Sequence, residues 1–444
     1  MSELAIFGGS KSVHTSIDDM FEWPIFTKEE DDAVLDVLHK HAMSGTTVTK
    51  QFEKEFAQWQ GTTYALGFNN GTASIHGALY GCGVGIGDEV ICPSATYWAS
   101  VAPLYSLGAT PVFADIDPDI LCIDPKDIEH RITSHTKAIM VVHCFAYPAD
   151  MDSIMEIARR HNLKVVEDVS HAQGGYYNER KLGSIGDVGA MSIMSGKSLA
   201  CGEGGMMVTN NREIYERAIA FGHFERFYNP AEFATEYLKE ALGLPIGGYK
   251  YRMHQMSSAV GRIQLKYYDG RCAEIRKSMN YFWDQLAGLP GIRAHRPPAD
   301  SGSHMGGWYG SRGLYVPEEL GGLSIIRFCQ AVSAEGCAIQ PGGYRPLHLH
   351  PLFSTYDVYG HGKPTRMANS DHDLVQPLGT LPNAEGARFR VYTIPWFKHY
   401  RPEIIDEYIN AFRKVINHYQ ELLADDPGNP RDLGLYFTSH ASRL

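Results

Sequence analysis

Between residues 60 and 210, segments with the character of β-strands alternate with segments typical of helices. This alternation is typical of a mostly parallel sheet covered by helices on both faces, because parallel strands need crossover connections. We therefore predict an α/β fold. The expected strands are Thr63–Phe68, Glu89–Cys92, Thr110–Ala114, Lys137–His143 and Leu163–Glu167, and the expected helices are Thr72–Tyr80, Tyr97–Leu107 and Asp152–His161.

The rest of the chain predicts a second, smaller unit. A long helix is expected over residues 253–289, where it could link two domains. After Pro290, short strands, many Gly and Pro residues and a helix over Glu403–Leu423 favour a smaller C-terminal α+β domain, and residues 302–322 resemble a long surface loop. The predicted division is an N-terminal arm (1–43), a large domain (44–275), a small domain (276–425) and a flexible tail (426–444).

Composition and charge exclude several classes of partner. The chain has 40 Lys+Arg against 51 Asp+Glu, a net charge of −11, and no basic stripe, so nucleic-acid binding is not expected. No apolar run approaches the roughly 18 residues that a membrane helix needs. The first residues lack the pattern of a signal peptide, and the eight cysteines show no CxxC spacing. We expect reduced thiols and a cytoplasmic location.

Three segments carry residues suited to chemistry. The first, residues 69–74 (NNGTAS), follows a predicted strand and opens a predicted helix. Free N–H groups and the helix dipole make such a start an anion site, and Thr72 and Ser74 add hydroxyl donors. The alternative is an ordinary Asn-Gly turn with a threonine N-cap.

The second segment is residues 164–175 (KVVEDVSHAQGG), in which Asp168 stands where a buried parallel strand ends. Ligands of open α/β sheets bind at this carboxyl edge. A carboxylate there can hold a cationic ring nitrogen, and His171 could reach the same ligand. The alternative is an aspartate that caps the next loop.

The third segment is residues 190–209, in which Lys197 lies between two apolar strands and is flanked by Ser192, Ser195 and Ser198. A partly buried lysine has a lowered pKa and can form a Schiff base. The alternative is a solvated lysine in a hairpin. Together the three segments offer an anion cradle, an acid for a ring nitrogen and an amine for an aldehyde, which are the needs of pyridoxal 5'-phosphate.

Eight ordered motifs between Ser44 and Ala259 carry a family resemblance, which continues more weakly to about Val415. The motifs are NNGTASIHGAL, GDEVICPSATYWAS, PVFADIDPDILCIDP, VVHCFAYPADMDSI, VVEDVSHAQGG, GDVGAMSIMSGK, GEGGMMVTN and GYKYRM. The chain resembles the sugar aminotransferases often called the DegT/DnrJ/EryC1/StrS family, within the fold-type I pyridoxal-phosphate enzymes. Within that family it is similar to the keto-inositol aminotransferases and the aminohydroxybenzoate synthases.

The resemblance implies a role for each matching residue. Lys197 matches the lysine that holds the cofactor and shuttles a proton, Asp168 the partner of the pyridinium nitrogen, and His171 a residue beside the ring hydroxyl. The remaining implied cofactor contacts are Tyr97, which stacks on the ring, Gly71, Thr72 and Ser192 at the phosphate, and Lys250 and Arg252, which lie in a segment that reaches the partner subunit's cofactor.

The run Tyr344–His350 resembles the family's substrate-side loop, so Tyr344 and His348 are candidate substrate contacts. His348 and His350 could also suggest a metal, but no carboxylate or cysteine lies at ligand spacing, and no metal is expected. The chain departs from the family at Ile193, where an aromatic residue is usual, and at Met194, where a more polar residue is usual.

The function expected from the resemblance is ping-pong transamination, from glutamine or glutamate to a keto-sugar or keto-cyclitol, in sugar or cyclitol biosynthesis of secondary metabolism. A homodimer with shared active sites is expected. One alternative is a pyridoxal-phosphate dehydratase acting on a similar polyol, which the pair Gly196-Lys197 favours because it resembles the aminohydroxybenzoate synthases. A non-catalytic cofactor-binding regulator is a second alternative, against which the intact Lys197 and Asp168 argue.

Overall fold

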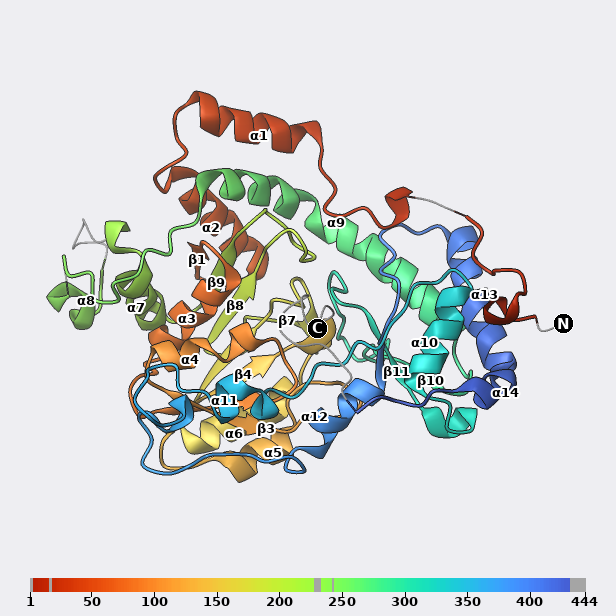
Figure 1. The fold of residues 1–444 in the computed structure, drawn as a ribbon. Coiled ribbons are helices and arrows are strands. Elements are labelled where there is room, and N and C mark those ends of the chain that lie inside the picture. The colour runs from red at the N-terminus through yellow and green to blue at the C-terminus, as the bar shows by residue number, and fades with distance from the viewer. Residues whose placement is uncertain (1–2, 16–17, 227–232, 242, 432–444) are drawn as a thin grey trace.

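A seven-stranded sheet lies at the centre of the larger part of the molecule (Figure 1). The computed structural model describes residues 3–15, 18–226, 233–241 and 243–431. The strand order is β1-β9-β8-β5-β4-β2-β3, and β9 is the strand of this sheet that runs antiparallel to its neighbours. The strands are β1 Tyr64–Phe68, β2 Glu89–Pro93, β3 Thr110–Ala114, β4 Thr136–Val142, β5 Lys164–Asp168, β8 Val188–Ser192 and β9 Gly205–Thr209. The predicted mostly parallel α/β sheet is confirmed.

Helices cover the sheet and connect its strands. The central strands β4 and β5 are mostly buried, as expected of a parallel sheet between helical layers; β4 is apolar on both faces after Lys137, and β5 ends in the buried carboxylates of Glu167 and Asp168. Helix α3 packs on β8 and β9, and α2 packs on β1. The helices of this part are α1 Lys28–His39, α2 Thr47–Gln60, α3 Gly71–Gly81, α4 Pro103–Ser106, α5 Pro125–Arg131, α6 Met151–His161, α7 Arg212–Gly222 and α8 Glu236–Glu240, beside a small hairpin of β6 Tyr176–Tyr177 and β7 Arg180–Lys181.

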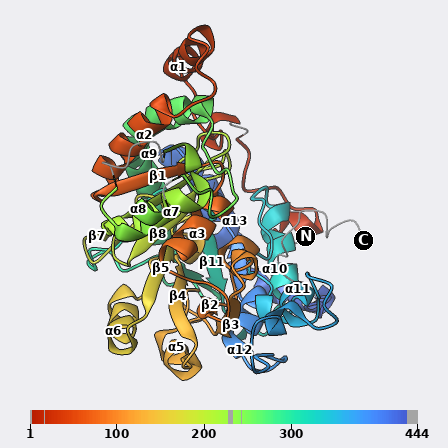
Figure 2. The same cartoon turned by 90° about the vertical axis from the view of Figure 1, so that its left-hand side faces the viewer.

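Helix α9, Gln255–Gln285, joins the two parts of the molecule. Its 31 residues correspond to a length of about 46 Å at 1.5 Å per residue. The helix runs past the large sheet and continues to the smaller C-terminal part (Figure 1), and Figure 2 shows its label beside that of α2. It packs against α1 and α2 in the former and against α13 in the latter. The long helix predicted over residues 253–289 is confirmed.

The smaller part is built on a three-stranded antiparallel sheet in the order β10-β11-β12. Its buried apolar side chains pack with those of α9, α10 and α13, among them Phe282, Phe328 and Phe412. The elements after α9 are β10 Ile292–Ala294, β11 Arg312–Tyr315, α10 Ile325–Ala334, α11 Pro351–Ser354, α12 Pro382–Gly386, β12 Val391–Thr393, α13 Pro402–Asn417 and α14 Tyr419–Leu422.

Two local predictions are wrong. The expected helix over Tyr97–Leu107 is instead a 3₁₀ turn at Trp98–Ser100 followed by the short helix α4. Proline has no N–H and its ring clashes with the preceding turn, so Pro103 begins a helix there and cannot continue one. The expected surface loop over 302–322 contains the middle strand β11 of the small sheet, and Trp308 is only 2% exposed.

An N-terminal strap, residues 3–15, lies on the smaller part of the molecule. The buried carboxylate of Glu335 accepts hydrogen bonds from the backbone N–H groups of Ala5 (2.8 Å) and Ser12 (3.1 Å), and from Lys414 Nζ (2.9 Å). The carboxylate of Glu407 accepts from the backbone N–H of His14 at 2.7 Å. The strap is therefore fixed to the end of α10 and to α13 in the smaller part of the molecule.

Three other expectations concern the cysteines, membrane-spanning helices and the tail. All eight cysteines are buried and free. Among the described helices, none is long and apolar enough to cross a membrane. Residues 432–444, which make up most of the predicted flexible tail (426–444), lie outside the described residues.

Candidate active site

A cavity of about 370 Å³ opens where the carboxyl ends of β1, β5 and β8 meet. The carboxyl ends of parallel strands lie at one edge of the sheet, which is where open α/β folds bind ligands. Eight of the eleven residues predicted for the site line this cavity: Gly71, Thr72, Tyr97, Asp168, His171, Ser192, Lys197 and Tyr344. Segments far apart in the sequence are therefore brought together at one place.

The N-terminus of α3 forms one wall of the cavity. Asn70 caps the helix, and its side-chain oxygen accepts from the backbone N–H of Ala73 at 2.8 Å. The threonine cap considered from the sequence is therefore replaced by Asn70. A Cβ atom on Gly71 would lie 2.4 Å from Cβ of Ser192, so glycine is what allows the helix to begin against the end of β8. The first N–H groups of a helix and its dipole attract an anion.

Asp168 ends β5 with a buried carboxylate at the floor of the site. Ser100 Oγ donates to its Oδ2 at 2.6 Å, and the backbone N–H of Ser170 donates to its Oδ1 at 3.0 Å. Ser170 Oγ in turn accepts from the backbone N–H of Ser192 at 2.9 Å, which connects this loop to β8. These hydrogen bonds hold the carboxylate in one orientation toward the cavity.

Lys197 lies in the loop between β8 and β9. Burial lowers the pKa of its amine from 10.5 to about 8, and the negative charge of Asp168 offsets this only in part. The amine nitrogen lies 4.2 Å from the centroid of the Tyr309 ring. The indole N–H of Trp23 donates to the carbonyl of Lys197 at 2.9 Å, so the segment that follows the strap helps to fix this loop.

His171 belongs to a stack of rings beside the cavity. Its ring is nearly parallel to those of Phe145 and Tyr344, with interplanar angles of 14° and 12°. Its Nδ1 accepts from the backbone N–H of Phe145 at 3.2 Å. Burial, with the positive charges of Lys197 and Arg312, holds the pKa of His171 well below 6.5. The imidazole is therefore neutral at physiological pH.

Three of the predicted residues do not line the cavity. His348 is buried, and its two ring nitrogens contact Ser94 Oγ at 2.7 Å and Glu385 Oε1 at 3.2 Å. Lys250 is exposed in the segment between α8 and α9, and Arg252 lies beside the end of β1, with Nη2 3.4 Å from Ser44 Oγ. In a single chain, none of these three side chains joins the cavity wall.

Four residues that the sequence did not single out contribute to the site. Ser100 and Ser170 contact Asp168, Tyr309 faces Lys197, and Trp23 holds the Lys197 carbonyl. Ser170 lies in the segment 164–175 that was singled out, whereas Ser100, Tyr309 and Trp23 come from segments that were interpreted as a helix, a surface loop and an N-terminal arm. The WY pair at 308–309 was a signal, because two adjacent large aromatic residues are not typical of an exposed loop.

The arrangement combines three chemical capacities in one enclosed space. A helix N-terminus with the hydroxyls of Thr72 and Ser192 can hold an anion. A fixed carboxylate, Asp168, can keep a ring nitrogen protonated. A lysine with a lowered pKa can attack an aldehyde carbon at neutral pH.

The model of the DegT/DnrJ/EryC1/StrS aminotransferase family matches residues 24–413. Among curated relatives, the L-glutamine:2-deoxy-scyllo-inosose aminotransferase of Micromonospora echinospora is 32% identical, over 95% of this chain and 100% of its own length. GDP-perosamine synthase of Caulobacter vibrioides is 36% identical, over 68% of this chain and 78% of its own length.

Solved structures of similar proteins share the fold of this chain. DesV of S. venezuelae, in complex with a ketimine intermediate, has a TM-score of 0.70 at 31% identity, and the match covers 88% of this chain and 94% of DesV. The synthase of 3-amino-5-hydroxybenzoic acid has a TM-score of 0.72 at 22% identity, over 90% of this chain and 99% of that one, a likeness that establishes a shared fold.

Proposed function

The chain belongs to the DegT/DnrJ/EryC1/StrS aminotransferase family, and from this premise we propose that it transfers an amino group from L-glutamine or L-glutamate to a keto-cyclitol or keto-sugar. The protein is a pyridoxal-phosphate-dependent aminotransferase of fold type I. In the proposed reaction the amino acid becomes a 2-oxo acid and the ketone becomes an amine. The order is ping-pong, so the oxo acid leaves before the ketone enters.

The observation that carries this proposal is the convergence of Lys197, Asp168 and the N-terminus of α3 on one cavity. The donor set fits pyridoxal 5'-phosphate, because the helix N-terminus suits its phosphate, Asp168 its ring nitrogen and Lys197 its aldehyde. The close approach at Gly71 also fits, since any side chain there would collide with Ser192 and displace the helix end that faces the anion. When bound, the cofactor supplies an aldehyde that carries the amino group and a ring that accepts electrons from the substrate.

Each side chain has a proposed task. Lys197 Nζ binds the aldehyde at rest and, once the donor has displaced it, moves a proton at the donor's Cα. Asp168 holds the proton of the ring nitrogen, and Ser100 and Ser170 keep its carboxylate in place. Thr72, Gly71 and Ser192 bind the phosphate.

The remaining tasks are orientation and exclusion of water. His171 is neutral because of its lowered pKa, and its Nδ1 already accepts from Phe145, so its Nε2–H donates one hydrogen bond at the ring hydroxyl without adding charge. Tyr97 packs on one face of the ring, and Tyr344 contacts the substrate. The large domain, residues 44–275, binds the cofactor, and the small domain, residues 276–425, closes over the substrate.

A homodimer completes each site in this proposal. Lys250 and Arg252 stay outside the cavity of their own chain, so they act at the cofactor of the neighbouring chain. A lysine supplies a point charge for a phosphate, and an arginine can bind it with two N–H groups.

The acceptor is proposed to be rich in hydroxyl groups. Thr96, Tyr309 and Tyr344, which carry hydroxyls, line the cavity together with Glu203, whose carboxylate can accept from several hydroxyls of one substrate. Among the described residues of the cavity wall, Lys197 is the one cation. A nucleoside diphosphate would need positive charge beyond Lys197 and beyond Lys250 and Arg252 of the neighbouring chain, which are assigned to the cofactor phosphate, and this favours an acceptor without one.

An absorbance experiment on the purified holoenzyme tests the function. Adding L-glutamine or L-glutamate without acceptor is expected to bleach the yellow absorbance of the lysine-bound cofactor, and adding the ketone should restore it. Lys197→Ala should abolish the yellow absorbance. Lys181→Ala is the matched control, because burial also lowers the pKa of that lysine but it packs against Trp59, outside the cavity.

The same experiment separates the alternatives. Yellow absorbance that both donors leave unchanged, together with loss of water from a polyol, would replace transamination by the dehydratase that Gly196-Lys197 favours. A protein that takes up no pyridoxal 5'-phosphate would contradict the assigned site residues.

A further inference from the structure

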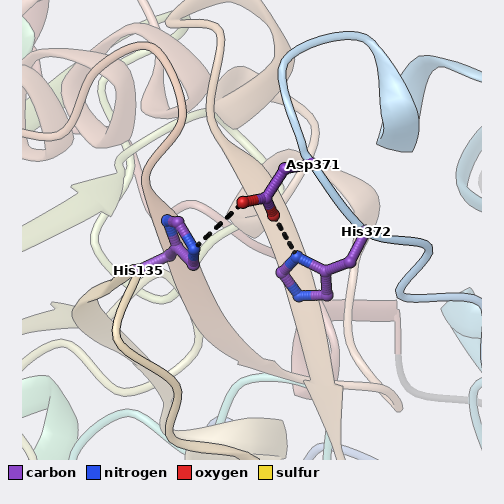
Figure 3. A group of neighbouring side chains, drawn as sticks. All are labelled: His135, Asp371 and His372. Carbon is purple, nitrogen blue, oxygen red and sulfur yellow. Dashed lines mark hydrogen bonds and ion pairs between the residues drawn. The ribbon is translucent and has the colours of Figure 1, made fainter.

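Two histidines and an aspartate meet at the edge of the large sheet opposite the cavity. His135 immediately precedes β4, whereas Asp371 and His372 belong to the connection between α11 and α12 (Figure 3). One ligand atom from each of the three lies within 4.8 Å of the others. The amino ends of β2 and β4 form this edge, so the group is remote from the site at the carboxyl ends of the strands.

The aspartate carboxylate lies between the two imidazoles. Asp371 Oδ1 accepts from His372 Nδ1 at 2.6 Å, and Asp371 Oδ2 lies 3.7 Å from His135 Nε2 (Figure 3). All three side chains reach solvent, with exposed fractions of 42% for His135, 74% for Asp371 and 40% for His372. An ion could enter from water, and rotation of these side chains can shorten the remaining distances.

A buried carboxylate orients one of the imidazoles. His372 Nε2 lies 3.2 Å from Oε1 of Glu89, a side chain that is 2% exposed. The Thr133 hydroxyl donates to the other oxygen of Glu89 at 2.6 Å and accepts from the backbone N–H of His135 at 3.1 Å. A metal-ligating histidine characteristically donates its second N–H to such a carboxylate.

We propose that His135, Asp371 and His372 bind one divalent transition-metal ion, with Zn²⁺ as the ion that fits the donor set. Two imidazole nitrogens and one carboxylate, with a fourth position open to water, match the ligands that zinc takes in proteins. The ion replaces the proton that joins His372 Nδ1 to Asp371, and His372 keeps its Nε2 proton for Glu89. His135 is far in the sequence from the adjacent pair Asp371 and His372, so ligand spacing could not reveal this site, and the proposal replaces the expectation of no metal.

The ion would fasten the connection between α11 and α12 to the large sheet. This connection already follows the edge strand β3, where the Gln376 side chain accepts from the backbone N–H of Phe113 at 2.9 Å and donates to its carbonyl at 2.6 Å. Asn369 Nδ2 donates to the carbonyl of Gly108 at 3.1 Å. A metal at Asp371 and His372 would add a further attachment between Asn369 and Gln376, at the place where His372 already contacts Glu89.

Titration calorimetry of the tag-free holoenzyme with ZnCl₂ tests the proposal. The titration is carried out at about pH 8, above the ordinary histidine pKa of about 6.5, because a neutral imidazole binds metal. One Zn²⁺ per chain is expected for the unchanged protein. His135→Ala and His372→Ala should each weaken binding by more than about tenfold, because each removes a ligand. MgCl₂ should give no binding at the same concentrations, because Mg²⁺ prefers oxygen ligands.

His161→Ala is the matched control. His161 also pairs with a carboxylate, Glu129, at 2.8 Å, and should bind no metal of its own. Absence of Zn²⁺ binding, or equal binding by His135→Ala, His372→Ala and His161→Ala, would overturn the proposal. The transaminase activity of His135→Ala should stay unchanged, so this result is independent of the proposed function.

Discussion

The charge of Lys197 sets how the apoenzyme takes up its cofactor as the pH changes. The amine is protonated below its pKa of about 8 and neutral above it, and the neutral form attacks the aldehyde. The rate of uptake of pyridoxal 5'-phosphate should therefore rise with pH and level off above about pH 8. Stopped-flow absorbance measures this rate. A rate that continues to rise to the ordinary lysine pKa of 10.5 would contradict the role of burial.

The carboxylate of Asp168 should matter more than the hydroxyl that positions it. Asp168→Asn removes the charge that keeps the ring nitrogen protonated, and we expect kcat/KM to fall by at least about 100-fold. Ser100→Ala removes one hydrogen bond to a charged group, which corresponds to about a tenfold fall. Ser100→Thr retains the hydroxyl and should restore much of the activity. Steady-state kinetics compare the three variants, and similar values for Asp168→Asn and Ser100→Ala would argue against the assigned role.

The sequence located the cavity residues that are proposed to carry chemistry better than the residues that support them. Lys197, Asp168 and Thr72 could be located because each stands at a boundary between predicted elements, where the sheet edge brings ends together. Ser100 and Tyr309 could not, since nothing local distinguishes a serine or tyrosine that contacts a distant carboxylate or amine. Their positions depend on how the 3₁₀ turn at Trp98–Ser100 and the segment before β11 pack against β5 and the Lys197 loop.

At the scale of elements, the junction of α3 with β8 depends on the small size of Gly71. Gly71→Ala places a methyl group 2.4 Å from Ser192 Cβ, so the start of α3 must move away from the proposed phosphate position. We expect at least about a tenfold loss of cofactor affinity, the effect of one lost charged hydrogen bond. Gly270→Ala is the control: it lies inside α9 with nothing within 4 Å of its Cβ, and should leave affinity unchanged. Equilibrium dialysis of cofactor measures both.

Elements with a strong periodic pattern were predicted closely, and elements defined by tertiary contacts were not. The strand predicted over Thr110–Ala114 is β3 with the same bounds, and α9 differs from its prediction by a few residues at each end. Strand β11 was missed because its run of residues, Arg312–Tyr315, is short and follows a glycine-rich segment. Only pairing with β10 and β12 makes it a strand, and those partners lie outside any local window.

At the scale of the whole molecule, Glu335 fastens the N-terminal strap to the small domain. Burial alone would raise its pKa, but hydrogen bonds from Ala5 and Lys414 outweigh burial and lower it. The stabilisation is therefore present at neutral pH and is lost as the pH falls through the carboxyl range. Glu335→Gln leaves the amine of Lys414 without its counter-charge, and we expect the free energy of unfolding to fall by about 3 kcal/mol.

Urea denaturation at neutral pH measures this loss. Glu318→Gln is the control, because its pairing with Arg390 is exposed to water and should leave the midpoint nearly unchanged. Equal midpoints for the two variants would contradict the inference that the contacts of Glu335 stabilise the fold.

The strap also constrains the order in which the molecule can be finished during translation. Ala5 can form its hydrogen bond only after Glu335, 330 residues further along, has been synthesised. The hydrogen bond of His14 likewise depends on Glu407, 393 residues further along. Both partners emerge from the ribosome long after the large domain has left it. Trp23, which contacts the Lys197 loop, comes eight residues after the end of the strap. The nascent large domain can therefore acquire its sheet early, while the strap remains undocked until synthesis is nearly complete.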